Sequence, residues 1–239
     1  MNLIIDIGNS YTKFALTESG KIVYLERFEK VTVDVLDHFL DEHPVTKSII
    51  AATGLIDEDV YQPLFLQTKT IRMDSSTRIP IINKYSTPKT LGSDRIALAV
   101  GASSLYHGDD LLIVDCGTAI TYDLINRNKE YLGGAISPGL RLRFESLNAN
   151  TANLPLIDIE TNYPLIGNST KDCILSGVLN GAMAEVDSYI LRVKNDYPNI
   201  KTLITGGDAN FFAVKLKNSI FVVHNLIVNG LNTILEFNT

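Results

Sequence analysis

Apolar and polar residues in the first part of the chain follow the two-residue period that is typical of β-strands. Segments 2–7, 11–16 and 21–28 are short, apolar or alternating, and turn-forming Gly, Asn and Ser residues separate them. They predict a meander of three strands. Two later apolar segments, 47–53 and 70–75, predict further short strands.

A helical period separates these strands. In segment 33–43, apolar residues recur at the spacing of one helix face. Segment 57–68 predicts a second helix, interrupted near Pro63 because proline lacks the amide hydrogen that a helix interior uses. A third helix is expected to start near Gly92, with Ser93 as its capping residue and an acid in its first turn.

The second half of the chain repeats this plan. Segments 111–115, 119–125 and 131–137 predict another three-strand meander. The later patterns predict a helix at 138–149, a long helix at 169–197, a strand–turn–helix unit at 201–216 and a closing helix at 224–237. Gly177 and Gly181, four residues apart in the long helix, indicate close helix packing. A duplicated plan predicts an α/β fold of two similar halves facing each other across a cleft, where ligands usually bind.

Composition narrows the class of protein. With 21 Lys and Arg against 27 Asp and Glu, the net charge is -6, and no basic run is present. A nucleic-acid partner is therefore not expected. The four histidines fit no metal-ligand spacing, so a zinc site is not expected either.

The expected location is the cytoplasm. No basic and apolar leader precedes the first strand, and no apolar run approaches the roughly 18 residues of a membrane span. We therefore expect no membrane association. The chain has two cysteines, Cys116 and Cys173, which favours a reducing compartment over a disulfide framework.

Two of the predicted strands end in an acid followed two residues later by glycine. The motifs are Asp6-Ile7-Gly8 and Asp115-Cys116-Gly117. A glycine turn of this kind exposes several backbone N–H groups, which bind phosphate oxygens, and the absence of a Cβ lets the phosphate approach. Hydroxyl donors follow in both turns: Ser10, Thr12 and Thr118.

The carboxylates of these turns need a different explanation, because an acid beside a phosphate repels it. A cation between them removes the repulsion, so Asp6 and Asp115 are candidates for holding a cation or its bound water. Two such acids facing one triphosphate would form a phosphoryl-transfer arrangement. Neither a GxxxxGK[ST] loop nor a GxGxxG turn after a strand is present, which disfavours the common nucleotide folds.

The paired turns resemble the phosphate turns of the actin-like ATPase fold, which sugar kinases, acetate kinase and heat-shock chaperones share. Segment 202–212 is similar to the adenosine signature of that fold, where a Gly-Gly turn opens a helix. The resemblance implies a duplicated actin-like, ribonuclease H-like fold with two halves around a central cleft. We expect residues 1–108 to carry the first phosphate turn and a substrate motif, and residues 109–239 to carry the second phosphate turn and the adenosine motif.

A more specific resemblance lies at the start of the third helix. Tyr85, Pro88 and the run Gly92-Ser93-Asp94-Arg95 resemble the pantothenate-binding motif of type III pantothenate kinases. The runs GGAISPGL (133–140), TANLP (151–155) and IGNST (166–170) are similar to the middle section of that family. Together with the first turn and TGGDA, the resemblance covers nearly the whole chain. It departs from the family at Thr87, where asparagine is usual, and at Cys173, where alanine is usual.

This resemblance implies a reaction: ATP-dependent phosphorylation of pantothenate to 4′-phosphopantothenate, the first step of coenzyme A biosynthesis. Asp94 would be the catalytic proton acceptor, and Asp6 would be the second catalytic residue. The residues implied in ATP binding are Asp6, Ile7, Gly8, Asn9, Ser10, Tyr11, Thr12, Lys13 and Thr118. The residues implied in pantothenate binding are Tyr85, Gly92, Ser93, Asp94, Arg95 and Thr170.

The family resemblance also implies cofactors and a partner. Mg²⁺ would accompany ATP, and Asp115 would hold a monovalent cation, K⁺ or NH₄⁺. A homodimer is implied, with the substrate site completed across the interface, and the apolar long helix around 174–189 would contact its symmetry mate.

Two alternatives remain. One is a kinase of the same fold for another small hydroxy compound, against which the short chain and the GSDR run count. The other is a non-catalytic, nucleotide-binding regulator related to the same family. Such a regulator has no need of all three of Asp6, Asp94 and Asp115, and this chain has them all.

Overall fold

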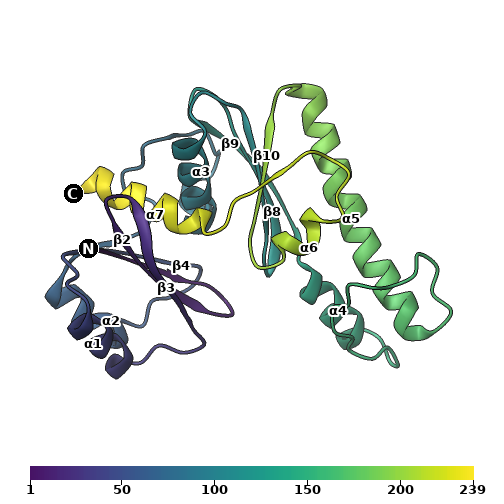
Figure 1. The fold of residues 1–239 in the computed structure, drawn as a ribbon, viewed down its shortest axis with the longest axis horizontal. Helices are drawn as coiled ribbons and strands as arrows, with labels where there is room; N and C mark the ends of the chain where they lie inside the picture. The colour runs from purple at the N-terminus through teal and green to yellow at the C-terminus, as the bar shows by residue number, and fades with distance from the viewer. The chain divides into compact units, whose positions relative to one another are not determined.

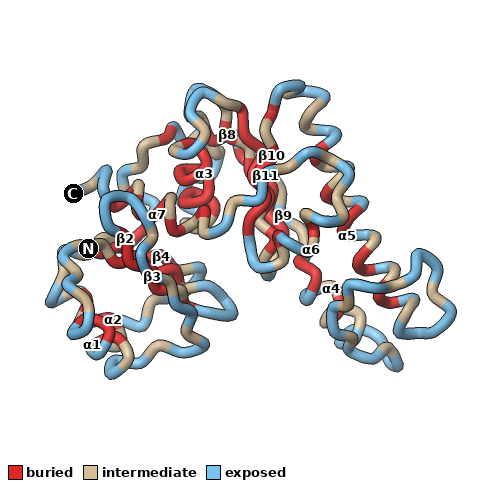
Figure 2. Tube along the Cα trace, in the orientation of Figure 1, coloured by how far each residue is buried: buried red, intermediate tan, exposed pale blue.

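The computed structural model describes residues 1–239, which form two compact units (Figure 1). The first contains residues 1–108, 127–132 and 225–239, and the second contains residues 109–126 and 133–224. In both units the buried segments concentrate on the strands and on the helix faces that cover them (Figure 2). No helix is both long enough and apolar enough to span a bilayer.

The first unit is built on a five-stranded sheet in the order β3-β2-β1-β4-β5. Its strands are β1 (Asn2–Ile7), β2 (Thr12–Glu18), β3 (Lys21–Phe28), β4 (Lys47–Ala52) and β5 (Lys69–Arg72). β1, β2 and β3 form the predicted antiparallel meander, whereas β1, β4 and β5 run parallel. The central strand β1 is apolar from Leu3 to Ile5, as expected for a strand covered on both faces.

Two helices cover one face of this sheet. They are α1 (Val33–Glu42) and α2 (Glu58–Gln67). Leu36 and Phe39 of α1 pack with Leu3, Ile5 and Phe14 of the sheet in one core cluster. The prediction that Pro63 interrupts the second helix was wrong, because α2 continues through it. Pro63 is the sixth of the ten residues of α2, so its missing N–H removes a single hydrogen bond in the middle of a short helix.

Helices α3 (Ser93–Leu105) and α7 (Leu226–Asn238) pack closely against each other, and α7 also contacts β1 and β4. Their crossing depends on two glycines. A Cβ on Gly230 would lie 1.8 Å from the carbonyl oxygen of Ala97, and one on Gly101 would lie 2.5 Å from that of Leu226. The C-terminal helix, expected with residues 109–239, therefore packs in the first unit.

The remaining elements of the first unit carry the predicted substrate segment. They are the two-residue strand β6 (Ile82–Asn83) and the 3-10 helix η1 (Pro88–Thr90). β6 pairs in parallel with Glu130 and Tyr131, the first residues of β9 (Glu130–Pro138), which belong to this unit.

The sheet of the second unit has the strand order β11-β10-β7-β8-β9. Besides β9, its strands are β7 (Leu111–Cys116), β8 (Ala119–Ile125), β10 (Lys201–Thr205) and β11 (Phe221–Val222). β7 is antiparallel to β8 and parallel to β10, just as β1 is antiparallel to β2 and parallel to β4. The predicted repetition of one plan is therefore visible in the strand pairing.

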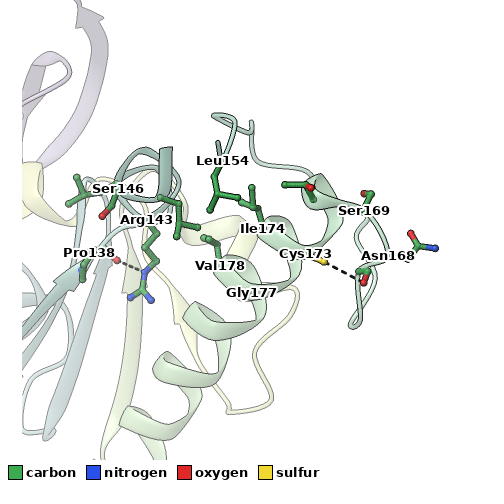
Figure 3. Close-up of a pocket in the computed structure, with 14 residues that line it drawn as sticks. Pro138, Arg143, Ser146, Leu154, Asn168, Ser169, Cys173, Ile174, Gly177 and Val178 are labelled. Atoms are coloured by element: carbon green, nitrogen blue, oxygen red, sulfur yellow. Dashed lines mark hydrogen bonds between the residues drawn. The ribbon is translucent and has the colours of Figure 1, made fainter. Parts of the chain in front are cut away.

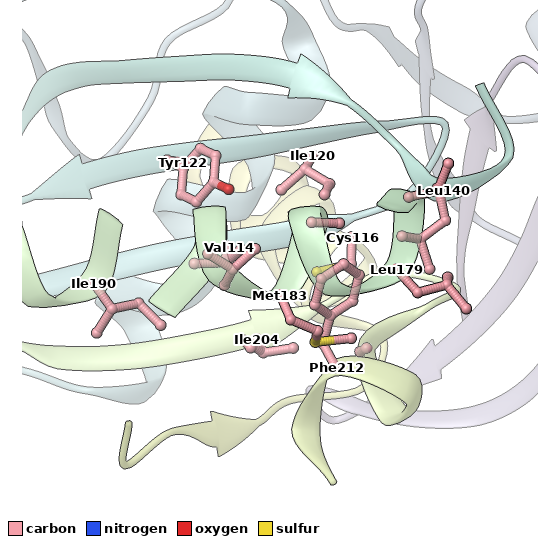
Figure 4. Packing of buried hydrophobic residues seen from close by; sticks show 14 of the residues in the cluster. Val114, Cys116, Ile120, Tyr122, Leu140, Leu179, Met183, Ile190, Ile204 and Phe212 are labelled. Atoms are coloured by element: carbon pink, nitrogen blue, oxygen red, sulfur yellow. The ribbon is translucent and has the colours of Figure 1, made fainter. Parts of the chain in front are cut away.

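Three helices accompany this sheet: α4 (Leu140–Ala149), α5 (Thr170–Asp196) and α6 (Ala209–Ala213). Figure 4 shows the hydrophobic core between these helices and the strands. In this core, Cys116 of β7 and Tyr122 of β8 belong to one cluster with residues of two helices: Leu179 and Met183 of α5, and Phe212 of α6. The buried apolar side chains of α5 thus lie in the core of the second unit. The prediction that another helix packs closely at Gly177 and Gly181 was wrong within a single copy of the chain, since nothing lies within 4 Å of a Cβ added to either residue.

Candidate active site

The turn predicted to bind phosphate in the first half of the chain, called the first phosphate turn below, lies between β1 and β2 in the first unit. The N–H of Gly8 donates to the carbonyl oxygen of Tyr11 at 3.0 Å, which closes the turn. A Cβ on Gly8 would lie 3.2 Å from that same oxygen, tighter than ordinary contact. Ile7 is half-buried, Thr12 is buried on β2, and Gly8, Asn9, Ser10 and Tyr11 are exposed. The turn therefore presents its backbone and hydroxyl groups to solvent.

Asp6 is a buried carboxylate at the base of this turn. It lies opposite Lys13 in the β1–β2 ladder, and Lys13 Nζ is 3.2 Å from Asp6 Oδ2. Burial raises the pKa of Asp6 above its usual range, the Lys13 ammonium opposes this shift, and the negative charge of nearby Asp94 adds to it. Asp6, Lys13 and Asp94 therefore form one electrostatic cluster in the first unit.

The packing of α3 explains how Asp94 reaches this cluster. Ser93 is the first residue of α3, and its hydroxyl donates to the carbonyl oxygen of Ala52 at 3.2 Å. Ala52 ends β4 directly beside Ile7, which ends β1. The start of α3 is thereby fastened to the same sheet edge as the first phosphate turn. The prediction that Ser93 caps the helix was wrong, because Gly92 occupies the N-cap position.

Gly92 has a steric role at this point. A Cβ there would lie 2.3 Å from Asp94 Oδ1, so a larger residue would displace the carboxylate. Asp94 Oδ1 accepts a hydrogen bond of 2.8 Å from the N–H of Arg95, which orients it at the helix N-terminus. The Gly-Ser-Asp-Arg run thus serves to place one carboxylate.

The other predicted substrate residues of this unit lie beside it. Arg95 is buried, and its guanidinium carbon is 5.9 Å from the centre of the Tyr85 ring. The N–H of Tyr85 donates to Asn83 Oδ1 at 2.9 Å. Tyr85 and Arg95, ten residues apart in the sequence, therefore form a pair of an aromatic ring and a cation.

The second phosphate turn lies between β7 and β8 in the second unit. It has two residues, Gly117 and Thr118, and the N–H of Gly117 donates to the carbonyl oxygen of Ala119 at 3.0 Å. Gly139 packs directly on it, since a Cβ at Gly139 would lie 2.2 Å from the carbonyl oxygen of Gly117. Asp115 is half-buried and faces Thr121 in the ladder, whereas Asp6 faces a lysine. The two turns thus share a plan and differ in length and charge.

The predicted adenosine motif contacts this second turn. Gly206 has a positive φ of 96°, and a Cβ there would lie 2.4 Å from both Asp115 Oδ1 and the carbonyl oxygen of Cys116. The N–H of Asp208 donates to that carbonyl at 2.9 Å. Burial raises the pKa of Asp208. Asp208 belongs to the TGGDA run, and no role was predicted for it.

Thr170 lies elsewhere in the second unit, at the first position of α5. Ser169 caps the helix by accepting from the N–H of Asp172 at 3.1 Å, and its hydroxyl donates to Asp172 Oδ2 at 2.8 Å. Thr170 is exposed and lines a cavity of about 1210 Å³ between α4 and α5, whose other lining residues are mostly apolar (Figure 3). Cys173, the residue that departs from the family pattern, lines the same cavity.

The described residues contain no group of three or more His, Cys, Asp or Glu side chains that could hold a metal ion by themselves. In each phosphate turn the protein offers one carboxylate, Asp6 in the first unit and Asp115 in the second. Such sparse protein ligation suits Mg²⁺, which usually keeps several waters and binds one or two carboxylates together with substrate phosphates.

Comparison with known proteins identifies relatives of this arrangement. A family model described as type III pantothenate kinase matches residues 2–192. Proteins named type III pantothenate kinase from Christiangramia forsetii and Cytophaga hutchinsonii are each 40% identical, over 240 and 238 residues. The alignments cover 100% of this chain and 99% and 100% of those relatives.

Solved structures show the fold. A protein described as a Baf family transcriptional activator from Campylobacter jejuni has a TM-score of 0.58 at 24% identity, covering 99% of this chain and 98% of its own. A glucokinase from an Antarctic psychrotroph has a TM-score of 0.51 at 13% identity, covering 100% and 99%. These likenesses confirm the predicted actin-like fold of the sugar kinases. The family model and the full-length relatives show that this chain belongs to the type III pantothenate kinase family.

Proposed function

We propose that this protein transfers the γ-phosphoryl group of ATP to the primary hydroxyl of pantothenate, with Asp94 as the proton acceptor. The observation that carries the proposal is the fastening of α3 to the edge of the first sheet, which brings Asp94 into the electrostatic cluster of Asp6 and Lys13. A base and a phosphate turn that meet in one unit suit phosphoryl transfer to an alcohol. Family membership supports the choice of pantothenate as the alcohol.

Asp94 suits the role of general base because of how it is held. Its Oδ1 accepts from the N–H of Arg95, which fixes the orientation of the carboxylate, and we assign the acceptance of the substrate proton to Oδ2. General-base catalysis of this kind typically contributes about 100- to 10,000-fold in rate. The remaining acceleration would come from positioning and from charge stabilisation by the turn amides and by Lys13.

The cation requirement is the finer part of the proposal. Asp6 would hold Mg²⁺ or its bound water, and Asp115 would hold K⁺ or NH₄⁺, because both present hard carboxylate oxygens beside turns that suit phosphate. When bound, these cations supply positive charge that offsets the negative charge of the phosphates. Lys13 already neutralises part of the charge of Asp6, so the first turn accepts anions more readily than a lone aspartate would.

The ATP-binding set extends this proposal to the rest of the two turns. The exposed Gly8, Asn9, Ser10 and Tyr11 of the first turn, and Thr118 of the second, would bind the phosphates through backbone amides and hydroxyl groups. Tyr85 and Arg95 would bind the anionic substrate. Thr170 would contact pantothenate at the start of α5.

We also propose a homodimer, on different evidence from that expected. The apolar face of α5 is used inside the second unit, so it does not supply a dimer surface. The helix is left open at Gly177 and Gly181, of which Gly177 also lines the cavity beside α4, and strongly exposed apolar residues, Leu165 and Ile166, precede the helix. Open small residues beside exposed apolar ones suit a helix of a second copy.

We propose the cytoplasm as the compartment in which the enzyme works. Both cysteines are free thiols, Cys116 buried and Cys173 exposed, as expected in a reducing compartment.

The alternative of a non-catalytic regulator is disfavoured by geometry. A nucleotide-binding regulator has no need to hold an oriented carboxylate at the start of α3 next to a phosphate turn, yet Gly92 and Ser93 both serve that placement. The deciding experiment is the assay of purified protein with ATP, Mg²⁺ and pantothenate, with and without K⁺ or NH₄⁺. Formation of phosphopantothenate is expected. ATP turnover with another hydroxy compound, and none with pantothenate, would identify a different kinase.

A further inference from the structure

Tyr131 occupies a position in the first unit that the sequence analysis did not single out. It lies at the start of β9, and its side chain is fully buried. Its ring centroid is 6.1 Å from that of Tyr85, and the two ring planes are tilted by 55°. This separation and tilt are typical of favourable contacts between aromatic rings. The buried ring of Tyr131 is therefore in contact with the half-buried ring of Tyr85.

The segment that carries Tyr85 takes its position from the strand that carries Tyr131. β6 has only two residues, and such a strand has no stability without its partner. Two backbone hydrogen bonds hold it. The N–H of Ile82 donates to the carbonyl oxygen of Lys129 at 2.8 Å, and the N–H of Lys84 donates to the carbonyl oxygen of Tyr131 at 3.0 Å. These bonds fix the backbone on either side of β6, and the Tyr131 ring supports the side chain of Tyr85 that follows.

Tyr85 connects this support to the substrate motif. The Arg95 guanidinium carbon lies 5.9 Å from the centre of the Tyr85 ring, within the range of a cation–π interaction. Arg95 follows Asp94 at the start of α3 and is itself buried. A row of three side chains, Tyr131, Tyr85 and Arg95, thus runs from the core to the residues assigned to the anionic substrate.

We propose that Tyr131 is a positioning residue of the substrate site: its buried ring holds the Tyr85 ring, and through it the Arg95 guanidinium, in the arrangement that binds the anionic substrate. Tyr131 acts through Tyr85. The identity of the substrate rests on the proposed function, whereas the packing of the three side chains does not. The effect of removing the ring should therefore appear first at position 85 and then in substrate affinity.

The first test needs no activity. The chain contains no tryptophan, so Tyr85→Trp places a single tryptophan at the supported position, and its indole can be excited selectively at wavelengths that the tyrosines do not absorb. In this background, Tyr131→Leu is expected to shift the emission to longer wavelength and to lower the anisotropy, because the indole loses its buried neighbour. Tyr131→Phe keeps the ring and is expected to preserve the spectrum. Phe39→Leu, which removes a buried ring from α1 of the same unit, controls for a general loss of stability and should leave the spectrum unchanged.

The second test is kinetic. Tyr131→Leu is expected to raise KM for pantothenate by about 10-fold, because Tyr85 and Arg95 would no longer be held in position to bind it. KM for ATP is expected to stay within about 2-fold, because neither residue is assigned to ATP. Tyr131→Phe should retain parental values. An unchanged fluorescence spectrum in Tyr131→Leu would overturn the inference, as would an equal rise of both KM values that Phe39→Leu reproduces. A parental protein that does not phosphorylate pantothenate would instead refute the proposed function, and the fluorescence test would still decide the role of Tyr131.

Discussion

Lys13 Nζ lies 3.2 Å from Asp6 Oδ2, so the acid of the first phosphate turn is paired with a cation from the neighbouring strand. The pairing is a direct result of the β1–β2 register, in which the two residues are opposite each other. It only partly offsets the cost of burying a carboxylate, because burial has the larger effect and raises the pKa of Asp6.

The first prediction concerns stability at Asp6. Because its pKa is higher in the folded state, that state binds more protons than the unfolded chain. The contribution of Asp6 to stability is therefore fully present below the unfolded pKa and is lost as the pH rises through the folded pKa. At pH 7 this contribution is reduced, whereas asparagine carries no charge at any pH, so Asp6→Asn is expected to raise Tm at pH 7 by about 2–4 °C, equivalent to about 1 kcal/mol in a chain of this size. Activity is expected to fall at least about 100-fold.

The measurement is thermal unfolding at pH 7 and at pH 4, where the gain should shrink as Asp6 becomes protonated. Glu29→Gln removes an exposed carboxylate from the same unit and should change Tm by less than about 2 °C. A lower Tm for Asp6→Asn than for the parent at pH 7 would show that Lys13 outweighs burial.

The second prediction separates catalysis from binding at Asp94. Asp94→Asn keeps an oxygen that accepts from the N–H of Arg95, so the start of α3 should be preserved. The variant has lost the basic oxygen, and kcat is expected to fall by about 100- to 10,000-fold while pantothenate binding changes by less than about 3-fold. Steady-state kinetics and calorimetry on the same preparation measure both. Loss of binding together with turnover would make Asp94 a residue that positions the substrate, and near-parental turnover would remove it from catalysis.

The third prediction tests the cation at Asp115. Asp115→Asn is expected to reduce activation by K⁺ or NH₄⁺ by about 10-fold or more and to change KM for pantothenate by less than about 3-fold, because the neutral amide attracts a cation weakly. The assay is the initial rate as a function of K⁺ concentration at fixed Mg²⁺. A variant that responds to K⁺ as the parent does would assign the cation to another ligand.

The fourth prediction compares two adjacent glycines in the turn that follows β10. Gly206→Ala is expected to destabilise the second unit by about 1–3 kcal/mol, because its φ is positive and a Cβ would meet Asp115 Oδ1 and the carbonyl oxygen of Cys116 at 2.4 Å. Gly207→Ala is the matched control, since nothing lies within 4 Å of a Cβ there. Denaturant unfolding of the two variants checks the difference. Equal stability would mean that the turn relaxes and does not constrain Asp115.

The fifth prediction concerns association. Gly181→Leu places a large side chain on the open face of α5, where the isolated chain has room for it. The variant is expected to fold with at least the parental Tm, because leucine favours helix more than glycine does by about 1 kcal/mol, and to dissociate to monomer. Sedimentation velocity at several protein concentrations measures the change. A parental protein that is monomeric throughout would refute the dimer itself.

Local pattern was sufficient for much of this fold. Short apolar or alternating runs bounded by turn residues predicted β1 to β3 and β7 to β9, because strand and hairpin signals depend on neighbours in sequence. The motif Asp-x-Gly predicted two turns at equivalent places, after β1 and after β7, and the Gly-Ser-Asp-Arg run predicted the start of α3. Each of these features is encoded within about ten residues.

Tertiary packing decided what depends on distant parts of the chain. No local pattern shows that Ser93 would bond to Ala52 and leave the N-cap to Gly92, or that α7 would pack on α3 through Gly101 and Gly230. Likewise, the ring of Tyr131 meets that of Tyr85, a residue 46 positions earlier in the sequence, only because β6 pairs with β9. The sequence by itself therefore determined the local elements and the residues predicted to carry the chemistry. The pairing of remote backbone segments decided how those residues are held, because hydrogen bonds between strands join positions that are far apart in the chain.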